Sequence, residues 1–323
     1  MNARRAILLP WKVQDPHGEP LPLEVPESGL FAVRSGSGHG MTAFLRNLTC
    51  HLLNTTSSEG GKVLYFQPEG SRWEACTGLM KMEAAALGVD FSFNVRQFTF
   101  VKDFGTGDWR NYTEEEADLC QKALRKVQEW VTSGRLEVDE ETRTIEALCK
   151  KAREKGRDPS LKAIIVDGIR YYQVGREGGW PFVAGSRFSY LAGMLFYLAE
   201  DLRCPVVASS HLHDAAASHP CKMGTGVELF TEGGLAKYAD SEILLWNTFK
   251  PYARCRDLEE KEKRVEEMLQ EAGRPHFAML ARLSRHPWRQ AGDTWGVWQI
   301  SRDSGRIIQP RPIQQDKSKT ENV

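Results

Sequence analysis

The sequence predicts an α/β fold in which a mostly parallel β-sheet is flanked by helices and ends in an antiparallel edge. Three observations predict it. Short apolar runs alternate with helical patterns from residue 29 onward. A glycine-rich turn at 34–44 joins the first apolar run to a helical pattern. Two strand-like runs, 276–283 and 294–300, are joined by a polar loop with no helix between them, which predicts the antiparallel edge.

Composition limits the class of protein. The chain has 323 residues and no net charge, with 43 basic and 43 acidic side chains, so any surface for nucleic acid would have to be local. Its seven cysteines contain no C-x-x-C pair, which favours reduced thiols in the cytoplasm or another reducing intracellular compartment. No apolar run reaches the roughly 18 residues of a membrane span, so we expect no membrane contact.

The chain divides into three parts. Residues 1–28 contain five prolines and predict an extended N-terminal arm that packs on a neighbour or another subunit. Residues 29–309 form the predicted core domain. The tail, 310–323, is polar and is expected to be disordered.

The periodicity of apolar residues predicts the elements of the core in order. We expect strands at 30–33, 62–67, 95–101, 161–167, 205–210 and 241–246. We expect helices after residue 44, over 71–86, from 113 to 133, from 145, around 191–202 and over 256–272. Thr113 and Glu116 form a capping-box pattern at the start of the third helix, and Gly134 ends it. The charge-rich helix at 256–272 is expected to lie on the surface.

The glycine-rich turn predicts a phosphate-binding cradle, because glycines let successive N–H groups point at an anion at the positive end of the next helix. The candidate cradle residues are Ser35, Gly36, Ser37, Gly38, His39, Gly40, Met41 and Thr42. Against the pattern G-x-x-x-x-G-K-[ST], Gly40 and Thr42 match, but Met41 replaces the lysine and Ser35 replaces the first glycine. Taken alone, the fragment fits a turn without a ligand equally well.

Two acids follow predicted strands. Asp167 ends the run LKAIIVD, as a magnesium-binding acid of a P-loop enzyme does, so Thr42 and Asp167 are the candidate metal residues. Glu69 follows the run KVLYFQ and is the candidate base that orients water. The alternative for Glu69 is an acid stabilised at a helix N-terminus next to Ser71.

These segments together resemble the C-terminal RecA-like ATPase domain of replicative DNA helicases of the DnaB type, over about residues 28–300. The turn RSGSGHGMTAFLRNL, the segments FQPEGS and AIIVDGIRYY, and the later segments CPVVASSHLHD and GGLAKYADSEILLW carry the resemblance. It implies a RecA-like P-loop NTPase fold, ATP and Mg²⁺ as cofactors and single-stranded DNA as a partner. It also implies a homo-oligomeric ring, a hexamer in that family, and contacts with other replication proteins.

The resemblance also assigns further site residues. His211 stands where the family has a glutamine that senses the γ-phosphate, and Asp214 where it usually has an arginine. Arg282 and Arg285 lie at or near the positions of a basic pair that acts on a neighbouring subunit's nucleotide. Two loops, 170–185 and 214–235, would line the ring's channel and bind DNA through Arg170, Arg176 and Lys222, although such glycine-rich loops also fit plain connections. The family's N-terminal collar domain is expected to be absent.

The missing lysine limits the predicted chemistry. A thioether cannot neutralise phosphate, and losing one charge-assisted hydrogen bond costs about 1.5–3 kcal/mol in binding. Losing one transition-state donor typically costs roughly 10²–10³ in rate. Arg46, one turn after Thr42, is expected to face solvent rather than replace the cation.

Three functions follow from these patterns. The first is a DnaB-like protein that acts on DNA in replication or recombination and binds ATP at subunit interfaces with weakened or lost hydrolysis. The alternative is a catalytically inactive structural or adaptor ring that binds DNA or a partner helicase without using ATP. A RecA-like signalling ATPase with no role on DNA is a weaker third.

Overall fold

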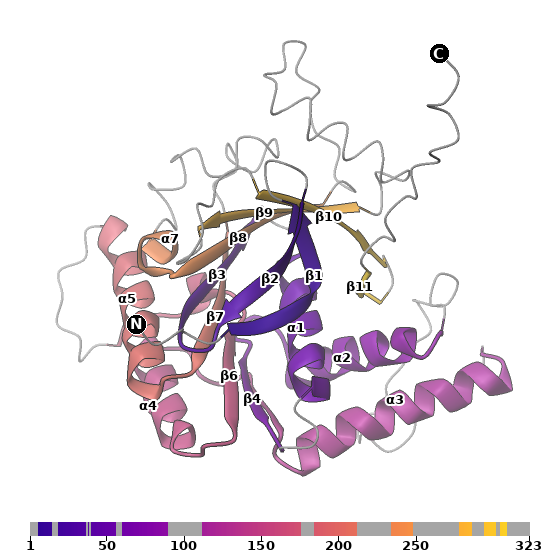
Figure 1. The fold of residues 1–323 in the computed structure, drawn as a ribbon. Coiled ribbons are helices and arrows are strands. Elements are labelled where there is room, and N and C mark those ends of the chain that lie inside the picture. The colour runs from indigo at the N-terminus through magenta and orange to yellow at the C-terminus, as the bar shows by residue number, and fades with distance from the viewer. Residues whose placement is uncertain are drawn as a thin grey trace, which may run out of the picture.

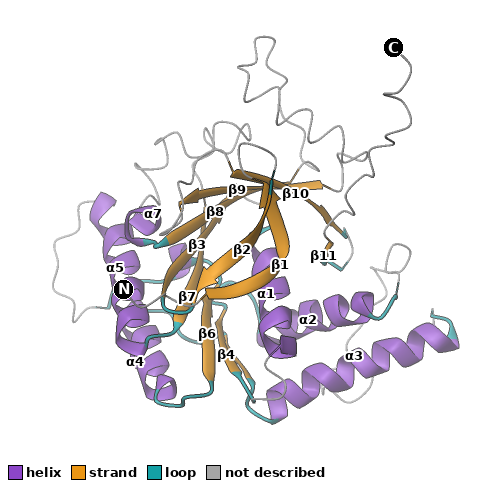
Figure 2. Ribbon diagram, in the orientation of Figure 1, coloured by secondary structure: helices purple, strands orange, loops and turns teal. Residues whose placement is uncertain are grey.

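A computed structural model of the chain describes residues 6–14, 19–36, 38, 40–55, 60–89, 112–175, 184–211, 234–247, 278–285, 294–301 and 304–308. The described strands form one eleven-stranded sheet, and helices lie on both of its faces (Figures 1 and 2). The predicted α/β fold, with a mostly parallel sheet and an antiparallel edge, is confirmed.

The parallel part of the sheet holds the elements that carry the candidate site. Its order is β5 (Leu136–Asp139), β4 (Lys62–Phe66), β6 (Leu161–Val166), β7 (Pro205–His211), β3 (Gly29–Ser35) and β8 (Ser241–Asn247). Parallel neighbours require crossover connections, and the helices between these strands supply them. The carboxyl ends of all these strands therefore lie at one edge of the sheet.

The antiparallel part is larger than expected. It contains β9 (Ala278–Arg285), β10 (Thr294–Ile300), β11 (Ile307–Ile308), β1 (Ala6–Gln14) and β2 (Pro20–Pro26). The predicted pair β9 and β10 is thus extended by two N-terminal strands, and β2 is the edge. Its prolines suit an edge strand, since they remove N–H groups that would otherwise be free to pair with another chain.

Of the two partners expected for the N-terminal segment, a neighbouring part of the chain or another subunit, the described residues contact the first. Trp11 of β1 is buried against the chain's own residues, with its ring 5.5 Å from Phe44 and 6.0 Å from Trp298. The indole of Trp298 also donates to the Lys12 carbonyl at 2.8 Å. The segment is extended, as predicted, but it belongs to the sheet because its alternate apolar side chains complete this core.

Helices cover the two faces of the sheet separately. One face carries α1 (Met41–Thr55), α2 (Arg72–Ala86) and α3 (Glu114–Thr132). The other carries α4 (Ile145–Gly156), η3 (Ile169–Tyr171), α5 (Ala184–Leu202) and α7 (Gly234–Tyr238). Alternation along β3 separates the two cores, since Phe31 and Val33 pack on the first face while Leu30 and Ala32 pack on the second.

Local sequence signals explain where several helices begin. The predicted capping box is present, because the Thr113 hydroxyl accepts from the Glu116 N–H at 3.2 Å and the Glu116 carboxylate accepts from the Thr113 N–H at 3.0 Å. Ser71 and Glu74 form a second box at the start of α2. Gly134 follows α3 with a positive φ of 73°, a conformation that favours glycine.

Some expectations lie outside the described residues: the strand at 95–101, the helix at 256–272, most of the two loops expected to bind DNA, and the tail. Strand β5 was not predicted, because its four residues are too few to show a period.

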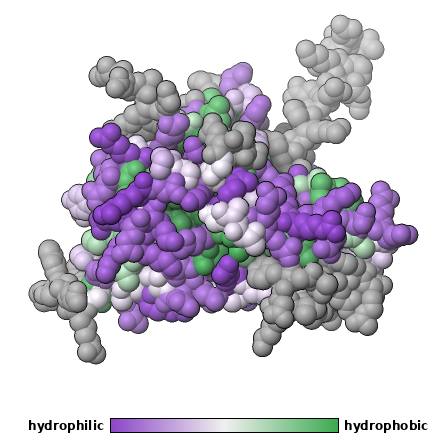
Figure 3. Space-filling view, turned by 90° about the horizontal axis from the view of Figure 1, so that it is seen from below, coloured by the Kyte–Doolittle hydropathy of each residue, from purple (hydrophilic) through white to green (hydrophobic). Residues whose placement is uncertain are grey.

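Within the described part, no helix is long and apolar enough to cross a bilayer. The five described cysteines are free and buried, and burial raises the pKa of each. The face in Figure 3 is mostly hydrophilic.

Candidate functional site

The candidate residues meet at the carboxyl edge of the parallel strands. Ser35 ends β3, Glu69 lies in the loop after β4, Asp167 follows β6 and His211 ends β7. Ser35 and His211 are direct partners in the parallel register of β3 and β7. Ligands bind at this edge in open α/β sheets, so the topology assembles the predicted residues from four distant segments.

The described glycines of the turn after β3 have the conformation expected of a phosphate-binding turn. Gly38 and Gly40 have φ values of 75° and 100°, which a side chain would strain. Helix α1 begins directly after Gly40, whose carbonyl accepts the Phe44 N–H at 2.9 Å. The N–H groups of the first turn have no intrahelical partner and are available to an anion. Ser37 and His39 lie outside the described residues.

Two cradle residues have buried side chains. Ser35 is fully buried, and its hydroxyl donates to the Gly36 carbonyl at 2.8 Å. Met41, which replaces the lysine, is 8% exposed and packs in the core beneath α1. Met41 can therefore offer its backbone N–H to a phosphate while its side chain contributes to packing.

Asp167 is the centre of the site. Its carboxylate accepts hydrogen bonds from the hydroxyls of Thr42 at 3.2 Å, Tyr65 at 3.0 Å and Ser209 at 3.1 Å. Burial raises the pKa of Asp167, and these hydroxyls and the guanidinium of Arg46 only partly offset the effect. The site thus holds a carboxylate that is costly to keep ionised even with Arg46 nearby.

These oxygen ligands suit Mg²⁺, a hard cation that usually takes one or two carboxylates, waters and substrate phosphates. Among the residues that the structure describes, no group of three or more His, Cys, Asp or Glu side chains could hold a metal by itself. Asp167 and Thr42 would therefore share the ion with phosphate oxygens and water.

Glu69 lies in the exposed loop after β4, near the turn after β6. Burial raises the pKa of Tyr171, as does the nearby carboxylate of Glu69. The Tyr171 hydroxyl also accepts from Arg170 at 2.6 Å, and the Arg170 guanidinium lies 4.7 Å from the Tyr171 ring centre. The phenol of Tyr171 is thus bonded to a candidate DNA-binding residue and lies near the candidate base. The capping acid of α2 is Glu74 and not Glu69.

A cavity of about 590 Å³ opens beside Asp167, between α1, α2 and the turn at 304–305. Thr42, Glu69 and Asp167 all line it. Arg46 lines it too, which corrects the expectation that this side chain faces solvent. The reason is the packing of α2 against α1, which leaves the Arg46 side chain between the two helices.

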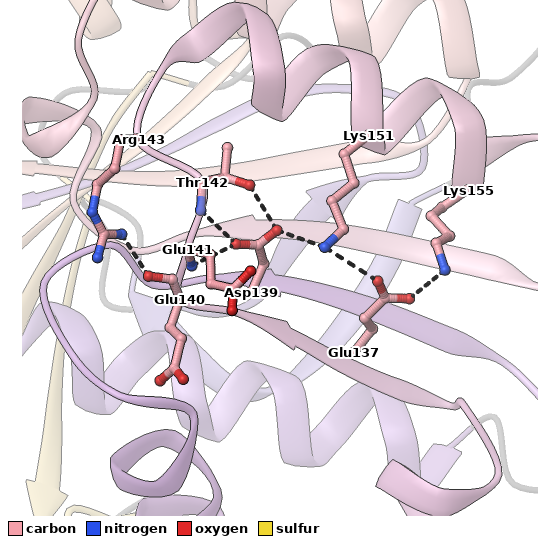
Figure 4. A network of polar contacts seen from close by, with 8 residues as sticks. All are labelled: Glu137, Asp139, Glu140, Glu141, Thr142, Arg143, Lys151 and Lys155. Carbon is pink, nitrogen blue, oxygen red and sulfur yellow. Dashed lines mark hydrogen bonds and ion pairs between the residues drawn. The ribbon is translucent and has the colours of Figure 1, made fainter.

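The loop after β5 lines a second pocket together with Glu69. Figure 4 shows the polar contacts that hold this loop. Asp139 accepts from the Glu141 and Thr142 N–H groups, both at 2.9 Å, and pairs with Lys151 at 2.8 Å. Burial raises the pKa of Asp139, but these partners outweigh it and the net shift is downward. The Arg72 N–H at the start of α2 donates to Glu140, so the loop is fixed to the helix that follows Glu69.

The remaining candidates are placed as follows. Arg170 lies on η3, and its carbonyl accepts from Arg187 at 3.1 Å. Arg282 and Arg285 lie on β9, where their backbones pair with Leu244 and Glu242 of β8. Arg176, Asp214 and Lys222 lie outside the described residues.

Three residues at this edge were not predicted as site residues: Tyr65, Ser209 and Tyr171. Tyr65 and Ser209 lie on the sheet face that α1 covers, as Asp167 does. The alternation of side chains could have shown this only if the neighbours of β6 had been known. Tyr171 belongs to the segment AIIVDGIRYY, but the resemblance assigns no role to this residue.

The fold resembles two solved structures. One, described as the ATPase domain of G40P, shares 13% identity with a TM-score of 0.63, and the match covers 88% of this chain and 86% of that one. The other, a DnaB-like replicative helicase described with its interactions with primase, has the same identity and TM-score over 88% of this chain and 59% of that one, so this chain spans less than two thirds of it. The sequence matches no protein-family model and no curated protein. The chain therefore has the RecA-like fold of helicase ATPase domains of the DnaB type, as the resemblance predicted.

Proposed function

We propose that this chain is a DnaB-like protein that binds Mg²⁺ and ATP at the carboxyl edge of its sheet, acts on single-stranded DNA, and hydrolyses ATP weakly or not at all. The observation that carries the proposal is the 3.2 Å hydrogen bond between Thr42 and Asp167, which come from the first turn of α1 and the end of β6. A hydroxyl and a carboxylate meeting at a glycine-rich helix N-terminus is the arrangement that P-loop proteins use for magnesium and phosphate.

Each residue then has a defined task. The N–H groups at the start of α1 bind phosphate oxygens, and Thr42 and Asp167 orient the ion that neutralises them. Tyr65 and Ser209 hold the Asp167 carboxylate by hydrogen bonds of 3.0 and 3.1 Å. Glu69 accepts a proton from water and orients it. Because Met41 supplies no charge, we expect binding to be retained better than turnover.

Ring assembly belongs to the same proposal. Arg282 and Arg285 would act on the nucleotide of a neighbouring subunit, and Arg170, Arg176 and Lys222 would bind the DNA backbone in a central channel. Light scattering with and without nucleotide and DNA tests assembly. A monomer under every condition would remove the ring, and with it the mechanism that depends on a neighbour's arginines.

The alternative is a structural or adaptor ring that binds DNA or a helicase without using ATP. The substitution of lysine by Met41 and of the sensor glutamine by His211 favours it. ATP turnover with and without single-stranded DNA separates the two, since the enzyme predicts turnover that DNA increases and that Glu69→Gln abolishes. Turnover that is the same in Glu69→Gln would support the structural ring.

Nucleotide binding is tested by titrating a fluorescent ATP analogue into the unmodified chain and into Asp167→Ala, with Mg²⁺ present. We expect weak binding by the unmodified chain and at least about a tenfold loss in Asp167→Ala, or roughly 1.4 kcal/mol. Asp201→Ala, an exposed aspartate on α5 that pairs with Arg153, is the matched control and should bind normally. Equal affinity in Asp167→Ala, or no binding at millimolar nucleotide, contradicts the proposal.

A further inference from the structure

The cavity beside Asp167 contains a cation that the P-loop pattern does not place there. Arg46 lies one helical turn after Thr42 on α1, so the two side chains share a face of the helix. Side chains on a helix lean toward its N-terminus. The guanidinium of Arg46 therefore extends toward the end of α1 where the glycine turn can bind an anion.

Its neighbours locate the guanidinium within the cavity. Arg46, Thr42 and Asp167 all line this cavity. The positive charge of Arg46 lowers the pKa of the Tyr65 phenol, whose hydroxyl donates to Asp167 at 3.0 Å, and that of the Asp167 carboxyl group, although burial raises both. Arg46 is thus close enough to act through its charge on the metal-side carboxylate and on Tyr65.

A glycine on the facing helix makes room for this side chain. A Cβ atom at Gly78, in α2, would lie 2.4 Å from Nη1 of Arg46. Glycine is unfavourable inside a helix, so its presence here is explained by the close approach of the guanidinium.

The cavity is also prepared for a polar ligand. Gln67, Thr77 and Arg46 line it, and each contributes a buried polar atom with no hydrogen-bond partner: Oε1, Oγ1 and Nε. Gln67 is only 5% exposed. Buried polar groups are normally paired, so these atoms indicate a ligand or ordered water that completes them.

We propose that Arg46 is the phosphate-binding cation of this site and takes the role that Met41 cannot fill, by binding the terminal phosphate of a nucleoside triphosphate. This inference rests on the proposed function, because it requires a nucleotide in the cradle. The guanidinium of Arg46 presents several donors to phosphate oxygens, whereas the lysine of the usual pattern presents one compact charge. Arg46 is thus a binding residue on the second turn of α1 instead of the first.

The test measures equilibrium binding of fluorescent ATP and ADP analogues, with Mg²⁺, to Arg46→Gln, Arg46→Lys and Gly78→Ala. Arg46→Gln should bind the ATP analogue at least about tenfold more weakly, with a smaller loss for the ADP analogue, which lacks the terminal phosphate. Arg46→Lys should recover part of the loss. Gly78→Ala keeps every cation but displaces the guanidinium, so it should also bind the ATP analogue more weakly.

The matched control is Arg153→Gln. Arg153 lies on α4, on the opposite side of the sheet, and pairs with Asp201 at 2.9 Å. This variant should bind both analogues normally. Thermal unfolding without nucleotide checks that each variant is folded. If the unmodified chain binds ATP and a folded Arg46→Gln binds it equally well, or loses ATP and ADP equally, the assignment of Arg46 is wrong while the proposed function stands. If the unmodified chain binds no nucleotide at millimolar concentration, both are wrong.

Discussion

Asp167 is held by three hydroxyl groups from three elements: Thr42 of α1, Tyr65 of β4 and Ser209 of β7. Ser209 also accepts the Gly168 N–H at 2.8 Å, which fixes the backbone directly after the acid. These three neutral donors position the carboxylate accurately, but with Arg46 they only partly offset the cost of burying its charge. A bound cation would offset the remainder of this cost.

This environment predicts how stability depends on pH. Because the pKa of Asp167 is raised in the folded state, that state binds the proton more tightly than the unfolded state. Without metal, stability should therefore fall as pH rises from the ordinary aspartate range through the raised pKa. Urea unfolding of the unmodified chain and of Asp167→Asn over a pH series measures this change in the free energy of unfolding.

In that series the stability of Asp167→Asn relative to the unmodified chain should increase with pH, since the amide does not titrate. A difference that does not change with pH would show that Asp167 has an ordinary pKa. Mg²⁺ with nucleotide should reduce the difference.

Single residues also show what sequence alone could supply. Thr42, Glu69 and Asp167 were identified because each follows a recognisable strand or turn, and the structure brings all three to one cavity. Arg46 was misjudged as solvent-facing, since only the packing of α2 through Gly78 encloses it. Tyr65 and Ser209 could not be found because their role depends on which strands flank β6.

At the scale of elements, the turn formed by Gly168 and η3 lies between the candidate residues for DNA binding and the candidate base for ATP hydrolysis. Gly168 has a φ of 90°, and a Cβ atom there would lie 2.5 Å from the Tyr171 ring. The turn thereby places Tyr171 between Arg170 and Glu69. A DNA phosphate that attracts Arg170 would remove a hydrogen bond from the phenol and so change the surroundings of the candidate base.

We predict that Tyr171→Phe raises basal ATP turnover by up to about tenfold, because the phenol near Glu69 no longer competes with water for the carboxylate. DNA should then stimulate turnover less than in the unmodified chain. Tyr197→Phe, on an exposed tyrosine of α5, is the control and should behave normally. Lower basal turnover in Tyr171→Phe would mean instead that the phenol positions Glu69 productively.

The prediction of elements succeeded where a signal was long or specific. The capping box at Thr113 and the apolar strand before Asp167 both lie where expected. It failed for β1 and β2, because prolines indicate an extended chain but not the partner with which it pairs. β2 pairs with β1, and β1 pairs with the distant strand β10, in which Trp295 is the register partner of Gln14.

At the scale of the whole molecule, the two N-terminal strands β1 and β2, called here the N-terminal ribbon, pack against α1, the helix that follows the candidate phosphate-binding turn. Trp11 contacts Phe44, which follows Thr42 by two residues on α1, and Trp298 stacks on the same ring at 6.1 Å. Removing this contact should therefore affect both the stability of the fold and the cradle.

Trp11→Ala should lower the free energy of unfolding by about 3–5 kcal/mol, the usual cost of deleting a buried aromatic ring. Leu8→Ala, on the same strand but 59% exposed, should change it by less than about 0.5 kcal/mol. Urea unfolding of both variants measures this. Similar stabilities of the two variants would indicate that the ribbon is not part of the stable core.

The central claim is that this RecA-like fold keeps the metal side of its nucleotide site and is limited by the missing charge at Met41. Met41→Lys tests it most directly, with ATP turnover measured with and without single-stranded DNA. Met41 is buried, so we expect some loss of stability, but a lysine at the first residue of α1 can extend its ammonium to the phosphates.

The account predicts that Met41→Lys raises turnover at least about tenfold, roughly 1.4 kcal/mol in barrier. The gain should disappear in Met41→Lys/Glu69→Gln, because the ammonium stabilises charge but does not orient water. Turnover that stays at background while nucleotide affinity improves would contradict the claim, and the structural ring would then be the better account.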